Sequence, residues 1–450
     1  FVEQFQQRRG TGAFNKIIYQ MLVLNKVRDC YINLRMLSKY AADASVGSSQ
    51  GNVSICLANA FDCVIDNCES VGGANGVMVF GTARGIAINR VGGMHKDDLI
   101  ALFTDGANTP HFDENGTQIN SAGEITNVNI DFQGRVSRTA SSATVKLNSQ
   151  NNHLIDGITI KNGGSIGSGV FFHVETVAGG SGLIGNVSIR DINIQPRSGN
   201  PVCLFTAFTT GSLAINKVAI DNLNISRGSN GSPGLGGVGG ALANFTAFAS
   251  CVIQEFSVIN SEVMHDTGIA GATINPFAVP SGGQIDRFYM ANTKWGGNGI
   301  ALALSGLTCT GTGAVRKVDF ENCEFGFPFQ GAVNIQATAA IVPSISFRNC
   351  RSFNGSMNAF INSNLPSNAV VNLYNCDWGN TLKGGLFMNT AAVATYNIFL
   401  EGCGSGARQI VDATVGTNHT YNIRSGGGNS SNSGAFITQA LGGAGNTWNF

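Results

Sequence analysis

The sequence predicts an all-β fold, a right-handed parallel β-helix in which short strands stack as the successive rungs of a solenoid. Three observations predict it: a strand pattern that returns at a nearly constant interval, alternation of apolar and polar residues, and a composition rich in Gly and poor in charge. Of the 450 residues, 60 are Gly, 12% are charged and 43% are hydrophobic. A disordered chain would carry more charge and fewer apolar residues, so we expect this chain to fold.

The repeat is clearest toward the C-terminus, where a short strand runs into Asn-Cys. Copies occupy residues 318–323, 345–350 and 371–376, and a fourth copy at 398–403 has Gly in place of Asn. The cysteines that end these copies are 27, 26 and 27 residues apart. Alternation with a period of two predicts strands, and units of this length without a helix favour a coil of parallel strands over propeller blades or leucine-rich repeats. Comparable strands upstream end at Asn67, Asn89, Phe132, Asn162, Asp191, Asn222, Asn260 and Asn292.

The number of rungs follows from the first and last copies of the strand. A first turn at residues 30–34 and two last turns at 421–424 and 447–450 give about fifteen rungs. We expect residues 46–450 to form the β-helix domain.

Residues 1–45 differ from the repeat and are expected to form an N-terminal capping segment together with the first rung. Within them, residues 3–9 could form a helix that covers the exposed edge of the first rung, which an open solenoid needs. The chain begins with Phe1 rather than Met, which indicates a processed or excised piece.

The repeated Asn and Cys residues are interpreted as structural. Asn side chains at one corner can donate and accept along the stack and so form an amide ladder. The 11 cysteines are odd in number and contain no Cys-x-x-Cys pair, so we interpret them as buried small apolar residues, with metal or redox chemistry as the alternative.

Charge and hydropathy narrow the classes of partner. Lys plus Arg and Asp plus Glu both number 27, so the net charge is zero and no basic excess indicates nucleic-acid binding. A neutral, polar surface is compatible with a polysaccharide partner. Residues 228–254 carry no charge, but they are rich in Gly and polar residues and their second half fits the repeat. We therefore expect no membrane insertion.

The strongest break in the repeat is a group of acidic residues around one strand. Asp97 and Asp98 open the strand at residues 99–102, His95 precedes them, and Asp105 follows the strand. A polar loop with His111, Asp113 and Glu114 comes next.

Stacking in register would add further polar side chains to this group. Lys146 and His173 would share an outward-facing column with Ala101, and Glu175 would lie near Phe103 in the next outward column. We predict that Lys146, His173 and Glu175, together with His95 before the strand, bind the substrate. For His95 and His173 the alternative is a structural or surface role.

Paired carboxyl groups indicate glycoside hydrolysis, which needs one protonated and one ionised carboxyl group. Asp97 and Asp98 are neighbours in a strand and would point to opposite faces. One of them could act with Asp105 or with a carboxylate from an adjacent rung, while the other serves the turn. The alternative is that the pair only forms a turn at the start of the strand.

A lyase is the second chemical alternative. Lys or Arg with a carboxylate-bound Ca²⁺ would favour β-elimination of a uronate. Residues 113–116 faintly resemble a calcium-binding loop but lack its full ligand spacing. We expect no metal site and no cofactor, and Ca²⁺ is the one cofactor kept as an alternative.

The segment Asp97-Asp98-Leu99-Ile100-Ala101-Leu102 resembles the Asp-Asp-x-Ile-Ala-Ile strand of the pectin-lyase-like β-helix superfamily, notably polygalacturonase-type hydrolases and phage tailspike depolymerases. In those families the aspartates of this strand are catalytic, so the resemblance implies catalytic roles for Asp97 and Asp98, and we add Asp105. It also implies a homotrimer, located in a virion tail or outside the cell, with a secreted bacterial protein as the alternative.

The chain departs from the family at other motifs. Residues 74–76 read Ala-Asn-Gly where polygalacturonases have Asn-x-Asp, and the Gly-His-Gly and Arg-Ile-Lys motifs are missing. We therefore expect a divergent, tailspike-like depolymerase that cleaves a bacterial surface or capsular polysaccharide, by hydrolysis rather than by β-elimination. The alternative is a non-catalytic glycan-binding adhesin or a structural appendage.

Aromatic side chains could provide stacking surfaces for sugars, although in solenoids they more often pack inside. The candidates for this role are Tyr289, Trp295, Phe353 and Trp378.

Overall fold

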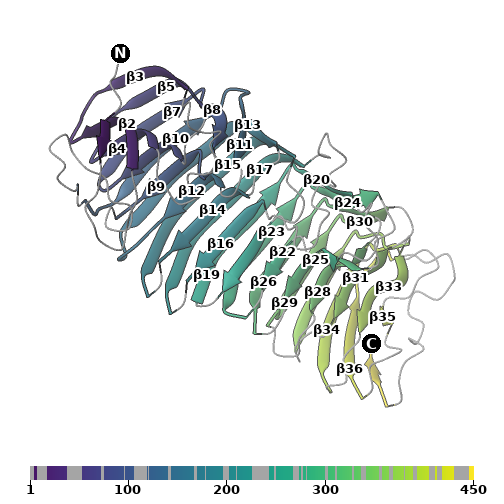
Figure 1. Ribbon diagram of the computed structural model, residues 1–450. Coiled ribbons are helices and arrows are strands. Elements are labelled where there is room, and N and C mark those ends of the chain that lie inside the picture. Colours follow the sequence, from purple (N-terminus) through teal and green to yellow (C-terminus); the bar gives the residue numbers. More distant parts are fainter. Residues whose placement is uncertain are drawn as a thin grey trace. The chain divides into compact units, whose positions relative to one another are not determined.

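The protein is all-β, as the computed structural model shows (Figure 1). Among the residues that the structure describes, every regular element is a strand and no helix long and apolar enough to cross a membrane occurs. The described residues are 5–7, 18–37, 53–71, 75–95, 97–105, 119, 121–139, 143–166, 170–177, 179–195, 202–208, 210–225, 243–247, 250–266, 273–274, 277–279, 281–298, 303–309, 312–326, 329–335, 341–353, 357–363, 368–379, 381–388, 393–404, 411–412, 418–429 and 445–450.

The chain divides into two compact units. Unit 1 comprises Phe1–Arg197, Val202–Ala219 and Phe248–Cys251, and unit 2 comprises Ser198–Pro201, Ile220–Ala247 and Val252–Phe450. In each unit the strands stack in parallel, with hydrogen bonds between strands that are far apart in sequence. This is a parallel β-helix-like architecture.

In unit 1, the first stack carries the candidate site described below. Its strands, in order of pairing, are β2 (Ile18–Asn25), β4 (Val53–Ala58), β6 (Asn75–Phe80), β9 (Ile100–Phe103), β12 (Ala143–Asn148), β14 (Val170–Thr176) and β16 (Cys203–Ala207). The short strand β1 (Phe5–Gln7) pairs antiparallel with β2. The expected helix over residues 3–9 is therefore wrong at residues 5–7, where the open edge of β2 provides a backbone partner that a helix could not use.

The second stack of unit 1 contains two rows of strands. The rows consist of β3 (Tyr31–Leu37), β5 (Val64–Val71), β7 (Ala83–Asn89), β8 (Gly92–His95), β10 (Ile125–Asp131), β11 (Val136–Thr139), β13 (Leu154–Ile166) and β15 (Ser181–Gln195). The long strands β5 and β13 pair with both rows.

Unit 2 repeats this arrangement. Its first stack contains β18 (Ala243–Ala247), β22 (Phe277–Val279), β25 (Ala303–Cys309), β28 (Phe329–Ile335), β31 (Met357–Ser363), β33 (Thr381–Met388) and β35 (Val411–Asp412), with β21 (Thr273–Ile274) also on β25. Its second stack contains β19 (Ser250–Ile259), β23 (Gly283–Ala291), β26 (Ala314–Glu321), β29 (Ser344–Arg348), β32 (Ala369–Tyr374), β34 (Thr395–Glu401), β36 (Thr420–Ser425) and β37 (Thr447–Asn449). Beside it run β20 (Glu262–Asp266), β24 (Lys294–Asn298), β27 (Glu324–Gly326) and β30 (Arg351–Phe353), while β17 (Ser212–Ile225) and β19 contribute residues to both units.

The core consists of columns of equivalent apolar residues, because alternation places every second side chain inside. One column in unit 1 has isoleucine at five successive positions, each at most 1% exposed. Its members face one another across successive strands: Ile65, Ile88, Ile130, Ile160 and Ile189. No single strand could bury its apolar face in this way, so the stacking itself supplies the core.

The predicted column of cysteines is confirmed in unit 2. The backbone N–H groups of Arg351, Asp377 and Gly404 donate to the carbonyl oxygens of Cys323, Cys350 and Cys376 at 3.0, 2.9 and 2.8 Å, which places these cysteines, followed by Cys403, at one position of successive turns. All eleven cysteines are free thiols, and all but Cys30 are buried.

The predicted amide ladder is also confirmed, and three of its members directly precede Cys323, Cys350 and Cys376. Its Asn members have a positive φ, from 49 to 52°, a conformation that Asn tolerates better than most residues. Each side-chain amide donates to the oxygen of the preceding member at 2.9–3.2 Å, through Asn375, Asn349, Asn322, Asn292 and Asn260 to the carboxylate of Asp221.

At two of the corners, a residue other than Asn has the positive φ. At the fourth Cys copy, the expected Gly402 has a φ of 63°, and a Cβ atom there would lie 2.1 Å from Asn375 Oδ1, so a larger residue would have to displace the Asn375 side chain. At the end of β7 in unit 1, the residue with positive φ is Arg90 rather than Asn89, because Asn89 still pairs with Asp66 and Asp131 as the last residue of the strand.

Candidate functional site

The first stack of unit 1 brings the predicted polar residues into the predicted register. Lys146 lies opposite Ala101 on one neighbouring strand and opposite His173 on the other. Asn148, two residues further along β12, lies opposite Phe103 and Glu175. The register inferred from the sequence is therefore confirmed, but the columns are not exposed: Ala101 and Phe103 are buried in an apolar cluster with Met78 and Phe80.

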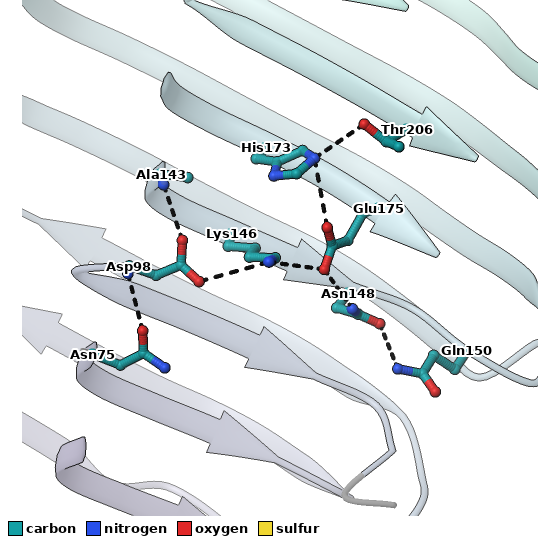
Figure 2. A network of polar contacts seen from close by, with 9 residues as sticks. All are labelled: Asn75, Asp98, Ala143, Lys146, Asn148, Gln150, His173, Glu175 and Thr206. Carbon is teal, nitrogen blue, oxygen red and sulfur yellow. Dashed lines mark hydrogen bonds and ion pairs between the residues drawn. The ribbon is translucent and has the colours of Figure 1, made fainter. Parts of the chain in front are cut away.

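Asp98 is buried at the start of β9 and is held from two sides (Figure 2). Its side chain is 2% exposed. The Asp98 backbone N–H donates to Asn75 Oδ1 at 2.9 Å, and the Ala143 backbone N–H donates to Asp98 Oδ1 at 2.9 Å. These bonds from the adjacent strands β6 and β12 fix the carboxylate, so that Oδ2 points to Lys146.

Lys146 bridges two carboxylates that come from different strands. Its Nζ lies 2.8 Å from Glu175 Oε1 and 3.8 Å from Asp98 Oδ2, and 15% of its side chain is exposed. Burial alone would lower the pKa of Lys146, but the nearby carboxylates of Asp98, Glu175 and Asp97 raise it above its ordinary value. Lys146 is therefore an ammonium ion at neutral pH and cannot act as a general base.

Glu175 is the centre of a chain of polar side chains on the other side of Lys146. Asn148 Nδ2 donates to Glu175 Oε1 at 2.8 Å, and Gln150 Nε2 donates to Asn148 Oδ1 at 2.7 Å. The Gln150 backbone N–H in turn donates to Thr104 Oγ1 at 2.8 Å. This chain satisfies buried groups that would otherwise be costly, and it fixes the position of Glu175.

His173 completes the cluster as a neutral side chain. Its Nε2 lies 3.1 Å from Thr206 Oγ1 and 3.7 Å from Glu175 Oε2. Burial lowers the pKa of His173, Glu175 opposes this shift and Lys146 adds to it, and together they bring the pKa to about 4. At neutral pH, His173 can therefore accept or donate one hydrogen bond at Nε2 without carrying a charge.

The two other predicted aspartates lie in different surroundings. Asp97 is half-buried, and it lies close enough to Lys146 for its charge to raise the pKa of Lys146. Asp105 lies beyond the far end of β9, where its Oδ2 accepts a hydrogen bond from Asn151 Nδ2 at 2.8 Å. Seven residues of nearly extended chain span about 20 Å, so the structure does not bring Asp105 to Asp98. The carboxylate that joins Asp98 comes instead from another rung, as Glu175.

His95 lies in β8 and is 1% exposed. A Cβ atom at Gly76 would lie 3.0 Å from His95 Nε2, so the imidazole packs closely against that glycine. The predicted loop residues His111, Asp113 and Glu114, with the loosely calcium-loop-like segment 113–116, lie outside the described residues.

The two bridged carboxylates are close together. The contacts of Lys146 place Asp98 Oδ2 and Glu175 Oε1 less than ~7 Å apart, close enough for the two charges to repel each other without the shared cation. The three carboxylates around one ammonium and one neutral imidazole give the cluster excess negative charge.

Sequence reasoning missed the residues that hold this cluster together. Asn75, Asn148, Gln150 and Thr206 were not predicted, although the register alone places Asn148 beside Glu175 and Thr206 beside it on the next strand.

The two candidate tryptophans pack inside and do not provide exposed stacking surfaces for sugars. Trp295 and Trp378 are at most 1% exposed and belong to the core. Tyr289 is half-buried and donates from its hydroxyl to Glu321 at 3.1 Å, and the side chain of Phe353 lies outside the described residues.

Within the described part of the chain, no group of three or more His, Cys, Asp or Glu side chains could hold a metal ion. Comparison with protein-family models, with curated proteins and with solved structures finds no match for this chain.

Proposed function

We propose that the chain is a right-handed parallel β-helix of about fifteen rungs, similar to the pectin-lyase-like superfamily, that binds and hydrolyses a polysaccharide. In this proposal residues 1–45 cap the first rung, and the protein acts as a homotrimer in a virion tail or outside the cell. The proposed catalytic site is the cluster of Asp97, Asp98, Lys146, His173 and Glu175. The proposal rests on the repeat, on the Asp-Asp strand and on the geometry of this cluster.

The observation that carries the proposal is that one buried ammonium gathers carboxylates from separate rungs. Hydrolysis needs one carboxyl group that protonates the glycosidic oxygen and another that activates water or attacks the anomeric carbon. Asp97 and Glu175 are the more exposed carboxyl groups, so we assign them contact with the sugar. Asp98 is a positioning residue, because it holds Lys146 while both of its own oxygens are engaged.

The hydrolytic step is balanced within the cluster and the solvent. The bond between the anomeric carbon and the glycosidic oxygen breaks as that oxygen takes a proton from one carboxyl group. A water molecule supplies the new oxygen on the anomeric carbon and gives its proton to the other carboxylate. Each cleavage therefore creates one new reducing end and no double bond.

The test is to incubate the full chain with a panel of capsular polysaccharides and to measure reducing ends, fragment size and the absorbance of unsaturated uronates. We expect new reducing ends without a rise in absorbance, and a loss of about a hundredfold or more in Glu175→Gln and Asp97→Asn. The matched control is Asp131→Asn, which removes a carboxylate paired with Lys161 at 3.3 Å on the other stack of the same unit. Unchanged activity in both cluster variants would refute the assignment, and a rise in absorbance would indicate β-elimination.

One observation favours a second function, a glycan-binding protein without catalysis. Asp98 is 1% exposed and both of its oxygens are engaged, which is how a purely structural network would look. In that case the chain would retain polysaccharides in a binding assay, and no fragments would appear with any member of the panel.

A further inference from the structure

We infer that unit 2 carries a separate binding groove for an acidic oligosaccharide, on the outer face of strands β32, β34, β36 and β37. Two of these strands, β34 and β36, are labelled in Figure 1. The groove encloses a cavity of about 600 Å³ that the side chains of these strands line. It goes beyond the proposed function, because it shares no residue with the Lys146 cluster.

A short amide ladder forms the polar floor of the groove. Asn422 Nδ2 donates to Asn397 Oδ1 at 3.0 Å, and Asn449 Nδ2 donates to Asn422 Oδ1 at 2.8 Å. The ladder uses one of the two N–H groups of each donating amide, and every amide oxygen has two lone pairs. The side chains therefore still offer donors and acceptors at a regular spacing of about 4.8 Å along the stack, which suits successive sugar hydroxyls.

Aromatic side chains form the apolar part of the groove. The rings of Tyr374 and Phe399 lie 5.4 Å apart with their planes tilted by 46°, and Phe450 lines the same cavity with 70% of its surface exposed. The guanidinium of Arg348 lies 5.4 Å from the centre of the Tyr374 ring and supports it from the preceding strand. Aromatic surfaces beside convergent polar groups are typical of ligand pockets.

The charge in the groove selects the class of sugar. Arg424 is exposed and lies opposite Phe399 in the register, and no Asp or Glu is among the described residues that line the cavity. Because none of these lining residues is acidic, the guanidinium of Arg424 favours a carboxylate of the ligand, which it can bind through two hydrogen bonds. The combination of rings, amides and one guanidinium therefore fits an oligosaccharide that contains uronic acids.

The experiment measures binding of the full chain to an array of uronate-containing oligosaccharides, each paired with its methyl-esterified form. We expect at least one acid to bind. Its methyl ester should bind about tenfold more weakly, because esterification removes the negative charge that Arg424 contacts. Phe399→Ala and Tyr374→Ala are expected to weaken binding of both forms by about tenfold or more. Arg424→Gln is expected to weaken only binding of the acid.

Two matched controls separate the groove from the rest of the surface. Tyr289→Ala removes a tyrosine that also lies beneath an arginine, Arg287 at 5.0 Å, on another part of the same stack. Arg190→Gln makes the same change of charge as Arg424→Gln in unit 1. Neither control is expected to change the affinity.

The binding assay is repeated with Glu175→Gln, so that failure of the proposed catalysis and failure of the groove are distinguishable. If Glu175→Gln loses cleavage but still binds the oligosaccharide, the result bears on the Lys146 cluster and leaves the groove intact. Absence of binding to every acid on the array, or affinity unchanged in the Phe399 and Tyr374 variants, would overturn the groove. So would a wild-type oligomer that dissociates in Phe399→Ala, because a second copy of the chain would then be the occupant.

Discussion

Replacing Lys146 by Met tests whether the polar cluster of unit 1 is held together by one buried ammonium. The substitution keeps much of the aliphatic stem but leaves the carboxylates of Asp98 and Glu175 without their shared cation. Two such charges about 7 Å apart repel by about 2 kcal/mol at an effective dielectric constant of 20. Loss of one partner from a buried ion pair costs about 3–5 kcal/mol in total, and we expect a loss of this size at pH 7.

The pH dependence distinguishes this cause from a simple loss of packing. Without Lys146, repulsion and burial raise the pKa of a carboxyl group in the folded variant above that in the unfolded chain. Such a group stabilises the fold at low pH and loses that contribution as the pH rises through its folded pKa. The variant should therefore recover toward the wild type at pH 5. His173 acts in the same direction, because Lys146 no longer lowers its pKa.

The assay is amide hydrogen exchange, because the three tryptophans, Trp295, Trp378 and Trp448, all belong to unit 2. Peptides that contain residues 143–148 and 170–176 should lose roughly a hundredfold or more of their protection at pH 7. Lys161→Met is the matched control, because Lys161 contacts a single carboxylate at 3.3 Å and should cost about 1 kcal/mol or less. An equal loss in both variants, or the same loss for Lys146→Met at pH 5 and pH 7, would refute the reasoning.

Three further predictions concern His173 and the corners of the stack. The pKa of His173 is about 4, against an ordinary 6.5, so this residue contributes stability above pH 6.5 that is lost as the pH falls toward 4. His173→Gln should therefore reduce the change in unfolding free energy across this pH window by about 3 kcal/mol. An unchanged pH profile in urea titrations would contradict this prediction. Asn349→Ala should cost about 1–2 kcal/mol, because it removes two ladder bonds at a φ of 51°, whereas Asn349→Gly keeps the backbone conformation and should cost less; the order of their urea midpoints checks this. Gly402→Ala should cost about 1–3 kcal/mol, since its Cβ would lie 2.1 Å from Asn375 Oδ1, while Gly427→Ala has no atom within 4 Å and should leave the melting temperature unchanged.

The strand register could be predicted from the sequence because alternation with a period of two leaves little freedom once neighbouring strands are in parallel contact. Lys146, Ala101 and His173 were placed in one column for this reason, and the structure confirms it. The columns of Cys and Asn followed from their spacing alone.

The side-chain contacts could not be predicted in the same way. The position of Asp98 depends on the Ala143 backbone N–H, which lies 45 residues away in sequence. The candidate partner nearer in sequence, Asp105, is separated from Asp98 by the full length of β9. Arg90 shows a similar limit, because the Asn expected at this corner is Asn89, which is the last residue of β7, whereas the positive φ occurs at Arg90.

The amide ladder of unit 2 has a direction. Each Nδ2 donates toward the preceding rung, and the series ends at Asp221, whose carboxylate can only accept. The same ending occurs in unit 1, where Asn162 donates to Asp131 and Asn216 donates through Asn186 to Asp156. An anion at the first position orients the dipole of every later amide in the same direction along the stack. Each added amide then polarises its neighbours and strengthens the hydrogen bonds before it. With Asn at that position the amides could flip as a set, and the column would lose its single orientation.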